Sequence, residues 1–295
     1  AALAREHDFG PNVTARTLRT RRTGAIAVVI PMGHDKAQHL SDPFFMAMLA
    51  NLADGLAERG YNLLLSRVLP VDPQWLDSFV DSGQVDGVIL IGQSDQSDVI
   101  ERVAARYRPL VVWGANLSDQ VQCTVGTDNR QGGAIATRHL LERGVTSFAF
   151  LGDPGAPEIA QRLAGMRDEL HRSGLASRLQ ILPAHLTAET AHHAISDWLD
   201  ATKTVPGGII AASDVIALSA LRALAEHGFA VPHDVKVVGY DDLPIAVQAT
   251  PPLTTIRQPI AEGAAMLIDL LFRRLGGEAT DPVVMEPQLI VRSSS

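Results

Sequence analysis

Short apolar runs alternate with longer amphipathic stretches along most of the chain. The first apolar run, Ala25–Ile30, contains only apolar residues and is followed by Pro31. A run this short and this apolar is typical of a strand that is buried on both faces. Residues Phe44–Arg59 instead carry apolar positions at helical spacing and stop at Gly60, a common helix terminator. The chain therefore begins with a predicted strand followed by a predicted helix.

The same alternation continues through both halves of the chain. Three further apolar runs predict strands in the first half: Tyr61–Leu65, Gly87–Ile91 and Leu110–Trp113. Four runs predict strands in the second half: Ser147–Leu151, Leu179–Leu182, Gly208–Ala212 and Val235–Tyr240. Helical spacing in the second half predicts four helices: Gln131–Arg143, Arg162–Ser173, Ala188–Asp200 and Val215–His227.

Two successive sets of strand–helix units predict an α/β protein with two doubly wound parallel-sheet lobes. Continuous apolar strands separated by helices are typical of parallel sheets that are covered on both faces. Such sheets bind ligands at the carboxyl ends of their strands, so we expect a site where the two lobes face each other. After Pro259, a predicted helix at Ala261–Arg274 and a predicted strand at Val283–Glu286 are too short for a third domain. We expect this segment to return across both lobes.

Charge is distributed unevenly over the 295 residues. Residues 1–24 contain five arginines and two acidic residues, a net charge of +3, which leaves −11 on the rest of a chain whose formal charge is −8. An acidic body does not attract nucleic acid, but a short basic arm can. A solvated terminus would account for the same charge pattern.

Cysteine usage and hydropathy indicate the compartment. Cys123 is the single cysteine, which excludes an intramolecular disulfide and a four-cysteine zinc site. No apolar run approaches the roughly 20 residues that cross a bilayer, and no basic-then-apolar export signal opens the sequence. We therefore expect a cytoplasmic protein without a membrane partner.

Seven local motifs occur in a specific order. They are FGPNVTARTL (Phe9–Leu18), DPFF (Asp42–Phe45), TDNRQGG (Thr127–Gly133), RLAGM (Arg162–Met166), ASD (Ala212–Asp214), VVGYDD (Val237–Asp242) and PPLTTIRQP (Pro251–Pro259). Each motif alone is weak, but their joint order over nearly the whole chain resembles the LacI/GalR family of bacterial transcription repressors.

The resemblance implies a fold like that of type I periplasmic sugar-binding proteins, with three crossings between the lobes. It assigns 1–24 to the end of a DNA-binding headpiece and a hinge helix. The first lobe is expected at 25–146 plus 259–280, and the second at 147–258 plus 281–295. A helix-turn-helix headpiece is expected to precede the sequence, of which residues 1–10 resemble only the end.

In repressors of this family, a short hinge helix enters the minor groove of operator DNA. The resemblance implies that Leu18 wedges between base steps, with Ala15 at the close approach and Asn12 as the helix cap. Arg16 and Arg19 would add phosphate contacts. Without DNA, a helix this short is marginal in water, so an irregular linker is the alternative conformation.

The resemblance also implies effector-binding residues in the cleft. Arg162 and Asp241 would hold effector hydroxyls or carboxylates, and an ion pair between the lobes is the alternative role for both. We expect one of Phe44 and Phe45 to face a sugar and the other to pack in the core. Trp113 is expected in either of these two roles.

Two further motifs supply candidates for the same site. Asp128 is expected to organise its turn, while Asn129 or Arg130 faces the ligand. Ser213 and Asp214 stand where many family members have Asn-Asp, and a serine offers the ligand a different hydrogen-bonding pattern because it lacks an amide.

Motifs of catalysis are missing from the sequence. It contains no GxSxG, GxxxxGK[ST], GxGxxG or HExxH pattern, so we expect no enzyme, no cofactor and no metal site. The expected partners are operator DNA, a small-molecule effector that is by analogy a carbohydrate, and a second copy of the chain, with the helix at Pro43–Leu56 as a candidate dimer contact. The alternative function is a solute-binding protein for a transporter, which would require an export signal and would leave the arginine-rich segment 12–22 without a purpose.

Overall fold

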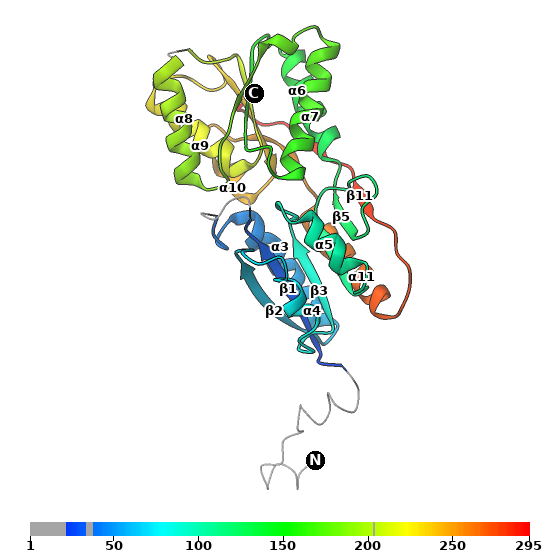
Figure 1. Cartoon of the computed structure of the whole chain (residues 1–295). Coiled ribbons are helices and arrows are strands. Elements are labelled where there is room, and N and C mark those ends of the chain that lie inside the picture. The colour runs from blue at the N-terminus through cyan, green and yellow to red at the C-terminus, as the bar shows by residue number, and fades with distance from the viewer. Residues whose placement is uncertain (1–21, 34–37, 203) are drawn as a thin grey trace, which may run out of the picture.

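The computed structural model describes residues 22–33, 38–202 and 204–295. These residues form two lobes stacked end to end, each with one six-stranded sheet covered by helices (Figure 1). The hinge residues predicted above, Asn12, Ala15, Arg16, Leu18 and Arg19, lie outside the described residues.

The first lobe is a parallel sheet with the strand order β11-β5-β4-β3-β1-β2. Its strands are β1 (Ala25–Pro31), β2 (Asn62–Val68), β3 (Gly87–Ile91), β4 (Leu110–Trp113), β5 (Cys123–Thr127) and β11 (Val283–Met285). Its helices are α3 (Pro43–Glu58), α4 (Asp77–Val80), α5 (Ser97–Ala104) and α11 (Ile260–Leu275).

The second lobe has the strand order β12-β10-β9-β8-β6-β7, with only the β10–β12 pair antiparallel. Its strands are β6 (Phe148–Leu151), β7 (Leu179–Leu182), β8 (Gly208–Ala211), β9 (Lys236–Asp241), β10 (Thr254–Arg257) and β12 (Gln288–Ile290). Its helices are α6 (Asn129–Glu142), α7 (Pro157–Arg172), the 3₁₀ turn η1 (Ala176–Arg178), α8 (Ala188–Thr202), α9 (Asp214–Glu226) and α10 (Pro244–Gln248).

Strand β1 shows why the apolar runs form a doubly covered sheet. Successive side chains of a strand point to opposite faces. Ile26 and Val28 accordingly pack with α3 and α11 on one face, whereas Ala27 and Val29 pack with the apolar residues of α5 on the other. A continuous apolar run is therefore required, and this confirms the prediction of strands buried on both faces.

Helix α3 begins and ends where its sequence predicts. The Asp42 carboxylate accepts a hydrogen bond from the Phe44 amide at 2.9 Å, and Pro43 occupies the first turn, where it lacks only a donor that would have no partner in the helix. Gly60 has a φ of +74°, a conformation that favours glycine and ends the helix.

Three short crossings connect the lobes, and they correct the predicted lobe boundaries. The first crossing lies at Asp128, because α6 packs in the core of the second lobe through Ala136 and Leu140. The predicted boundary at residue 146 is therefore wrong. The second crossing runs from β10 to α11. The third lies between β11 and β12, because β11 pairs with β5 in the first sheet, so the assignment of all of 281–295 to the second lobe is also wrong.

Two further local predictions differ from the structure. Helix α7 begins at Pro157, not at Arg162, since proline suits the first turn of a helix. Strands β5, β10 and β12 have no counterpart among the predicted runs. Their sequences, CTVGT, TTIR and QLI, mix polar and apolar residues and lack the continuous apolar character of the other strands. Within the described ranges, no helix is long and apolar enough to span a membrane.

Candidate functional site

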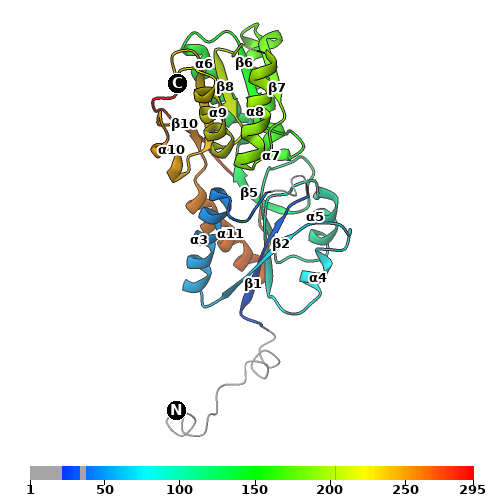
Figure 2. The same ribbon diagram turned by 90° about the vertical axis from the view of Figure 1, so that its left-hand side faces the viewer.

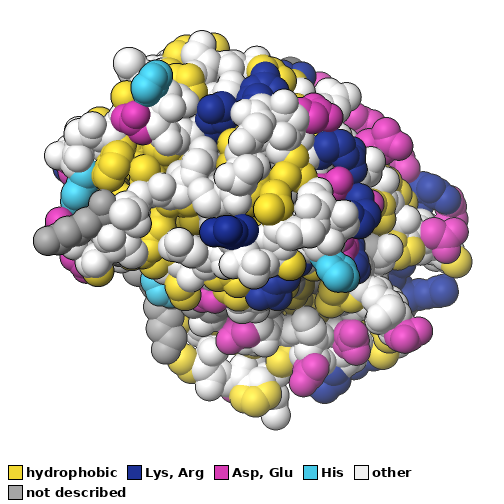
Figure 3. Space-filling model, turned by 90° about the horizontal axis from the view of Figure 1, so that it is seen from above, with side chains coloured by type: hydrophobic (Ala, Val, Ile, Leu, Met, Phe, Trp, Pro, Cys, Tyr) yellow, Lys and Arg dark blue, Asp and Glu magenta, His cyan; other side chains and the backbone are white. Residues whose placement is uncertain are grey.

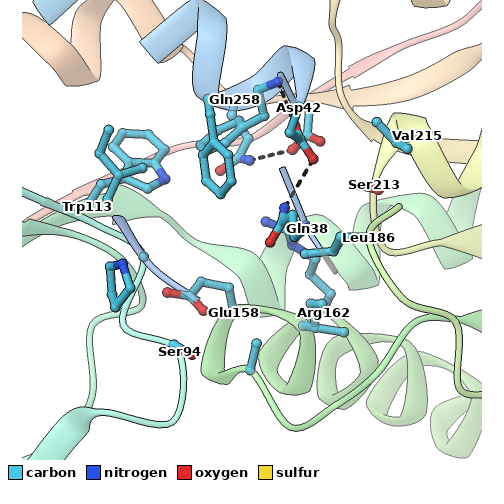
Figure 4. Close-up of a pocket in the computed structure, with 18 residues that line it drawn as sticks. Gln38, Asp42, Ser94, Trp113, Glu158, Arg162, Leu186, Ser213, Val215 and Gln258 are labelled. Carbon is cyan, nitrogen blue, oxygen red and sulfur yellow. Dashed lines mark hydrogen bonds between the residues drawn. The ribbon is translucent and has the colours of Figure 1, made fainter. Parts of the chain in front are cut away.

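A cavity lies between the two lobes, where the carboxyl ends of both sheets meet. It contains about 750 Å³ of space free of protein atoms, part of it open to solvent. Figure 4 shows side chains from both lobes pointing into this space. Eighteen residues line it: Pro31, Gln38, Asp42, Phe44, Phe45, Ile91, Gly92, Ser94, Trp113, Ala156, Glu158, Ile159, Arg162, Leu186, Ser213, Val215, Asp241 and Gln258.

Aromatic rings form the wall that the first lobe contributes. Phe44 contacts Phe45 edge-on, with ring centroids 5.9 Å apart, and lies 6.1 Å from the Trp113 ring. Phe45 is 7% exposed and belongs to the core of the lobe, whereas Phe44 is half-buried. Gly263 lets the indole lie against α11, because a Cβ at this glycine would be 2.2 Å from Trp113 Cζ3. All three predicted aromatic residues line the cavity, and Phe44 presents the more accessible ring.

Arg162 is held in place from three sides. Its Nε donates to Asn129 Oδ1 at 2.8 Å, its Nη1 donates to the backbone carbonyl of Ala212, and its guanidinium carbon lies 3.7 Å from the centroid of the Tyr240 ring. The side chain is 7% exposed. A buried guanidinium with these contacts is already oriented before any ligand arrives.

Asp241 is a buried carboxyl at the end of β9. Gln258 Nε2 donates to its Oδ1 at 2.6 Å (Figure 4). Burial raises the pKa of Asp241 to about 7, although the neighbouring Arg162 charge acts in the opposite direction. The residue has a φ of +118°, which directs its side chain away from the regular strand geometry. Near neutral pH the protonated form of this carboxyl can therefore donate a hydrogen bond, and the ionised form can accept hydrogen bonds.

Asp214 does not line the cavity. It is completely buried, where its Oδ1 accepts from Thr255 Oγ1 at 2.6 Å and its Oδ2 accepts from the Leu243 amide at 2.8 Å. Burial and the nearby Asp241 charge raise its pKa well above the usual value. Asp214 thus connects the loop that follows β9 with strand β10. Its neighbour Ser213 caps α9 by accepting from the Ile216 amide and does line the cavity.

The first polar residues of the TDNRQGG segment have different roles in the structure. Asp128 caps α6 by accepting from the Gln131 amide, as expected for a turn-organising residue. Asn129 is buried beneath Arg162 and orients it, without lining the cavity. Arg130 points away, with its side chain 62% exposed and its Nε 2.7 Å from Asp168 Oδ2. The predicted ligand contact by Arg130 is therefore wrong in this arrangement, because the start of a helix turns consecutive residues to different sides.

Two glycines allow α6 and α7 to approach closely beneath the cavity. A Cβ at Gly133 would lie 1.9 Å from the Arg162 carbonyl oxygen, and a Cβ at Gly165 would lie 1.8 Å from the Arg130 carbonyl oxygen. No side chain fits at either position unless the backbones separate. This close contact between the helices sets the position of Arg162 on α7 relative to Asn129 on α6.

Five polar residues of the cavity were not identified from the sequence: Gln38, Asp42, Ser94, Glu158 and Gln258. Asp42 was recognisable only as part of DPFF and as the residue before a helix. Glu158 lies on α7, and its Oε1 accepts from the Ala115 amide of the first lobe at 3.2 Å. Gln161, one turn further along α7, donates to the Asn116 carbonyl oxygen at 3.1 Å. These two hydrogen bonds join the lobes at the edge of the cavity.

Metal and thiol chemistry have no support in the part of the chain that the structure describes. Among those residues, no group of three or more His, Cys, Asp or Glu side chains is arranged to hold a metal ion. Cys123 is buried in the first lobe, where its thiol lies 3.6 Å from the Asp281 carbonyl oxygen.

Comparisons with known proteins agree with this fold. Residues 137–295 match the family described as periplasmic-binding-protein-like domain. The transcriptional regulator CelR of Thermobifida fusca, which has a helix-turn-helix, is 32% identical over 297 residues, covering 98% of this chain and 86% of CelR. A solved complex of CelR with cellobiose has a TM-score of 0.78 and 29% identity, covering 95% of this chain and 89% of that one. The lac repressor dimer bound to operator shares the fold, with a TM-score of 0.82 at 23% identity over 97% of this chain and 99% of that one.

Two lobes joined by three crossings around a polar and aromatic cleft define a ligand-responsive core of the periplasmic-binding-protein type. Its relatives are transcription regulators, not transporter components. The chain belongs to the LacI/GalR family of transcriptional regulators. The predicted fold class and the regulatory function are thereby confirmed, and the solute-binding alternative is disfavoured.

Proposed function

We propose that the cleft binds a carbohydrate effector, and that this binding controls the affinity of a homodimer for operator DNA. The observation that carries the proposal is the pairing of an aromatic wall with fixed polar groups across one cavity. Trp113 and Phe44 come from the first lobe, and Arg162 and Asp241 come from the second. Figure 4 shows Trp113 and Arg162 on different sides of the cavity.

This pairing suits a sugar because a pyranose has apolar faces and polar edges. The apolar face packs on an aromatic ring, and the edge hydroxyls require oriented donors and acceptors. Arg162 and Gln258 supply donors, and Asp241 supplies an acceptor. The solved cellobiose complex of the related CelR is consistent with a ligand of this class.

The proposed dimer surface is an apolar face that continues from one lobe to the other. Leu65 on the edge strand β2 is 40% exposed and points to the face that α3 covers, and Met46 on α3 is 43% exposed. Ile245 and Val247 on α10 are 44% and 56% exposed. Helix α10 lies above α3 in Figures 1 and 2, so the two apolar areas share one side of the molecule. Exposed apolar side chains that gather on one side of a molecule favour association.

We propose that operator DNA is bound at the end of the first lobe that lies farthest from the second lobe. The described chain begins at Arg22, at the far end of the first lobe, where Asp86 accepts hydrogen bonds from the Thr23 and Gly24 amides. The basic segment with Asn12, Ala15, Arg16, Leu18 and Arg19 precedes this anchor. Figure 3 views the end formed by the second lobe, where basic and acidic side chains are interspersed.

Effector control requires a ligand with different affinities for two lobe arrangements. The hydrogen bonds from Ala115 to Glu158 and from Gln161 to Asn116 cross the cleft, so their formation depends on lobe closure. We further propose a cytoplasmic protein without a catalytic step, in keeping with its relatives' role as transcription regulators.

Thermal shift of the chain against monosaccharides, cellobiose and other disaccharides, polyols and nucleobases tests the proposal. A ligand at about 100 times its Kd stabilises the fold by roughly 2.7 kcal/mol. We expect a carbohydrate to raise the melting temperature of the wild type but not of Arg162→Ala. The matched control Arg138→Ala, which removes an arginine paired with Glu169 on the surface of the second lobe, should keep the response. Stabilisation by nucleobases alone would refute the carbohydrate assignment.

DNA from upstream of the gene that encodes the chain tests the regulatory step. The test uses the chain together with the helix-turn-helix headpiece that is expected to precede it. Retarded migration of the DNA by this protein should change when the stabilising sugar is added. An unchanged DNA affinity at saturating sugar would show that the cleft does not control operator binding.

A further inference from the structure

The described residues that line the cavity carry an excess of negative charge. Asp42, Glu158 and Asp241 are carboxyl groups, and Arg162 is the one cationic side chain among these lining residues. Asp42 and Asp241 belong to different lobes, and their charges are close enough for the first to raise the pKa of the second. The cavity therefore gathers carboxylates from both sides.

The guanidinium group of Arg162 already has contacts with other groups of the protein. Its Nε and Nη1 donate to Asn129 and Ala212, and its guanidinium stacks on the Tyr240 ring. The same charge favours ionisation of Asp241. One guanidinium offsets one carboxylate, so Asp42 and Glu158 have no cationic counterpart among the described residues of the cavity wall.

One buried acceptor beside Asp42 lacks a donor within the described part of the chain. Gln38 is 3% exposed, and its Nε2 donates to Asp42 Oδ2 at 3.0 Å (Figure 4). Its Oε1 is buried and has no hydrogen-bond partner among the described residues. A buried acceptor without a partner costs free energy, and a ligand hydroxyl or ammonium group that reaches it would relieve this cost. The wall at Gln38 and Asp42 thus presents acceptors to a ligand that must donate.

Glu158 provides a second acceptor on the other side of the cavity. Its carboxylate is half-buried at the start of α7, and Oε1 accepts from the Ala115 amide. In Figure 4 the Glu158 side chain extends into the cavity beneath Trp113. A ligand lying against the indole would therefore meet a negative charge at its edge.

We propose that the cleft selects uncharged or cationic polyhydroxylated ligands and rejects anionic ones such as sugar phosphates and uronic acids, with Glu158 and Asp42 as the specificity-determining residues. An anion would meet two carboxylates of the same sign and would leave the Gln38 acceptor without a donor. An amino sugar would present both a positive charge and donors. This selection rests on the proposed carbohydrate function of the same cleft.

Matched ligand sets test the selection on the full chain by calorimetry. Each set contains a neutral sugar with its amino and anionic counterparts: glucose, glucosamine, glucose 6-phosphate and glucuronate, the corresponding galactose and mannose compounds, and cellobiose with cellobionate. We expect the neutral or amino member of a binding set to bind at least tenfold more tightly than its anionic counterpart. Equal or tighter binding of the anion overturns the selection but leaves the carbohydrate function intact. Absence of binding by every compound rejects the carbohydrate function and the selection together.

Glu158→Gln then tests the assigned residue. Glutamine keeps the shape and an acceptor oxygen but removes the charge, so the preference for the neutral over the anionic member should fall about five- to tenfold. Raising the salt concentration to 1 M should weaken the wild-type preference, because screening reduces charge repulsion in a cleft that is open to solvent. The control Glu189→Gln removes an exposed charge on α8 and should leave the preference unchanged. An unchanged preference in Glu158→Gln, or equal changes in both variants, overturns the role of Glu158.

Discussion

The close approach of α6 and α7 at Gly133 makes a sharp prediction about both stability and binding. In Gly133→Ala, the new Cβ would lie 1.9 Å from the Arg162 carbonyl oxygen, whereas ordinary contact begins at 3.4 Å. The helices must therefore separate by about 1.5 Å. The atom that is struck belongs to the backbone, so no side-chain rotation can relieve the clash.

The magnitude follows from two opposing effects. Overpacking a well-packed interior costs about 1–3 kcal/mol, and replacing a helical glycine by alanine returns up to about 1 kcal/mol. We expect a net loss of about 1–2 kcal/mol, which lowers the melting temperature by roughly 3–6 °C in a chain of this size. Effector affinity should fall about tenfold or more, because moving α7 lengthens the 2.8 Å hydrogen bond between Arg162 and Asn129.

Gly55→Ala in α3 is the matched control. Its Cβ would meet only Ile268 Cδ1, the flexible end of a side chain, at 2.6 Å. Thermal denaturation and calorimetry of both variants should therefore show a smaller loss of stability in Gly55→Ala and no loss of affinity. A Gly133→Ala protein that melts and binds like the wild type would refute the idea that this contact positions Arg162.

Three further variants address other features of the structure. Because burial raises the pKa of Asp241 to about 7, the folded state holds this proton more tightly than the unfolded state, and the free energy of unfolding should fall as pH rises from about 4 to 7. Melting curves across this range should decline less steeply for Asp241→Asn, and parallel curves would contradict the assignment. Asp214→Ala leaves the Thr255 hydroxyl and the Leu243 amide without their acceptor, so chemical denaturation should show a loss of about 2–5 kcal/mol, and a loss below 1 kcal/mol would argue against this structural role. Leu65→Glu should convert the proposed dimer to a monomer in light scattering, and a persistent dimer would place the interface elsewhere.

The sequence predicted the parts of the fold that depend on local pattern. Strands such as β1 and β3 consist of apolar residues that both faces of a sheet require, and helices such as α3 carry their own start and stop residues. Strands β5, β10 and β12 escaped prediction because pairing with neighbours, not local hydrophobicity, makes them strands. The lobe boundaries failed for the same reason, since only tertiary contacts assign α6 to the second lobe.

The candidate site divides in a similar way. Trp113 ends a predicted strand and Asp241 follows one, so their place at the carboxyl ends could be expected, whereas Arg162 was assigned to the site by the family resemblance. Gln38 and Gln258 come from irregular segments, whose path depends on contacts distant in sequence. The sequence also could not decide which of two consecutive residues points toward the site, as in the case of Asn129 and Arg130.

The last crossing has a consequence for how the chain folds during synthesis. Strands β11 and β12 are separated by two residues, yet β11 is the edge strand of the first sheet and β12 is the edge strand of the second. The ribosome delivers the N-terminal strands of both lobes long before either edge strand exists. The edges of β5 and β10 lack their pairing partners until residues 283–290 emerge, and both sheets are then completed almost simultaneously. A nascent chain arrested shortly before this point would carry two open sheet edges at once, which makes it a substrate for chaperones that bind unpaired strands.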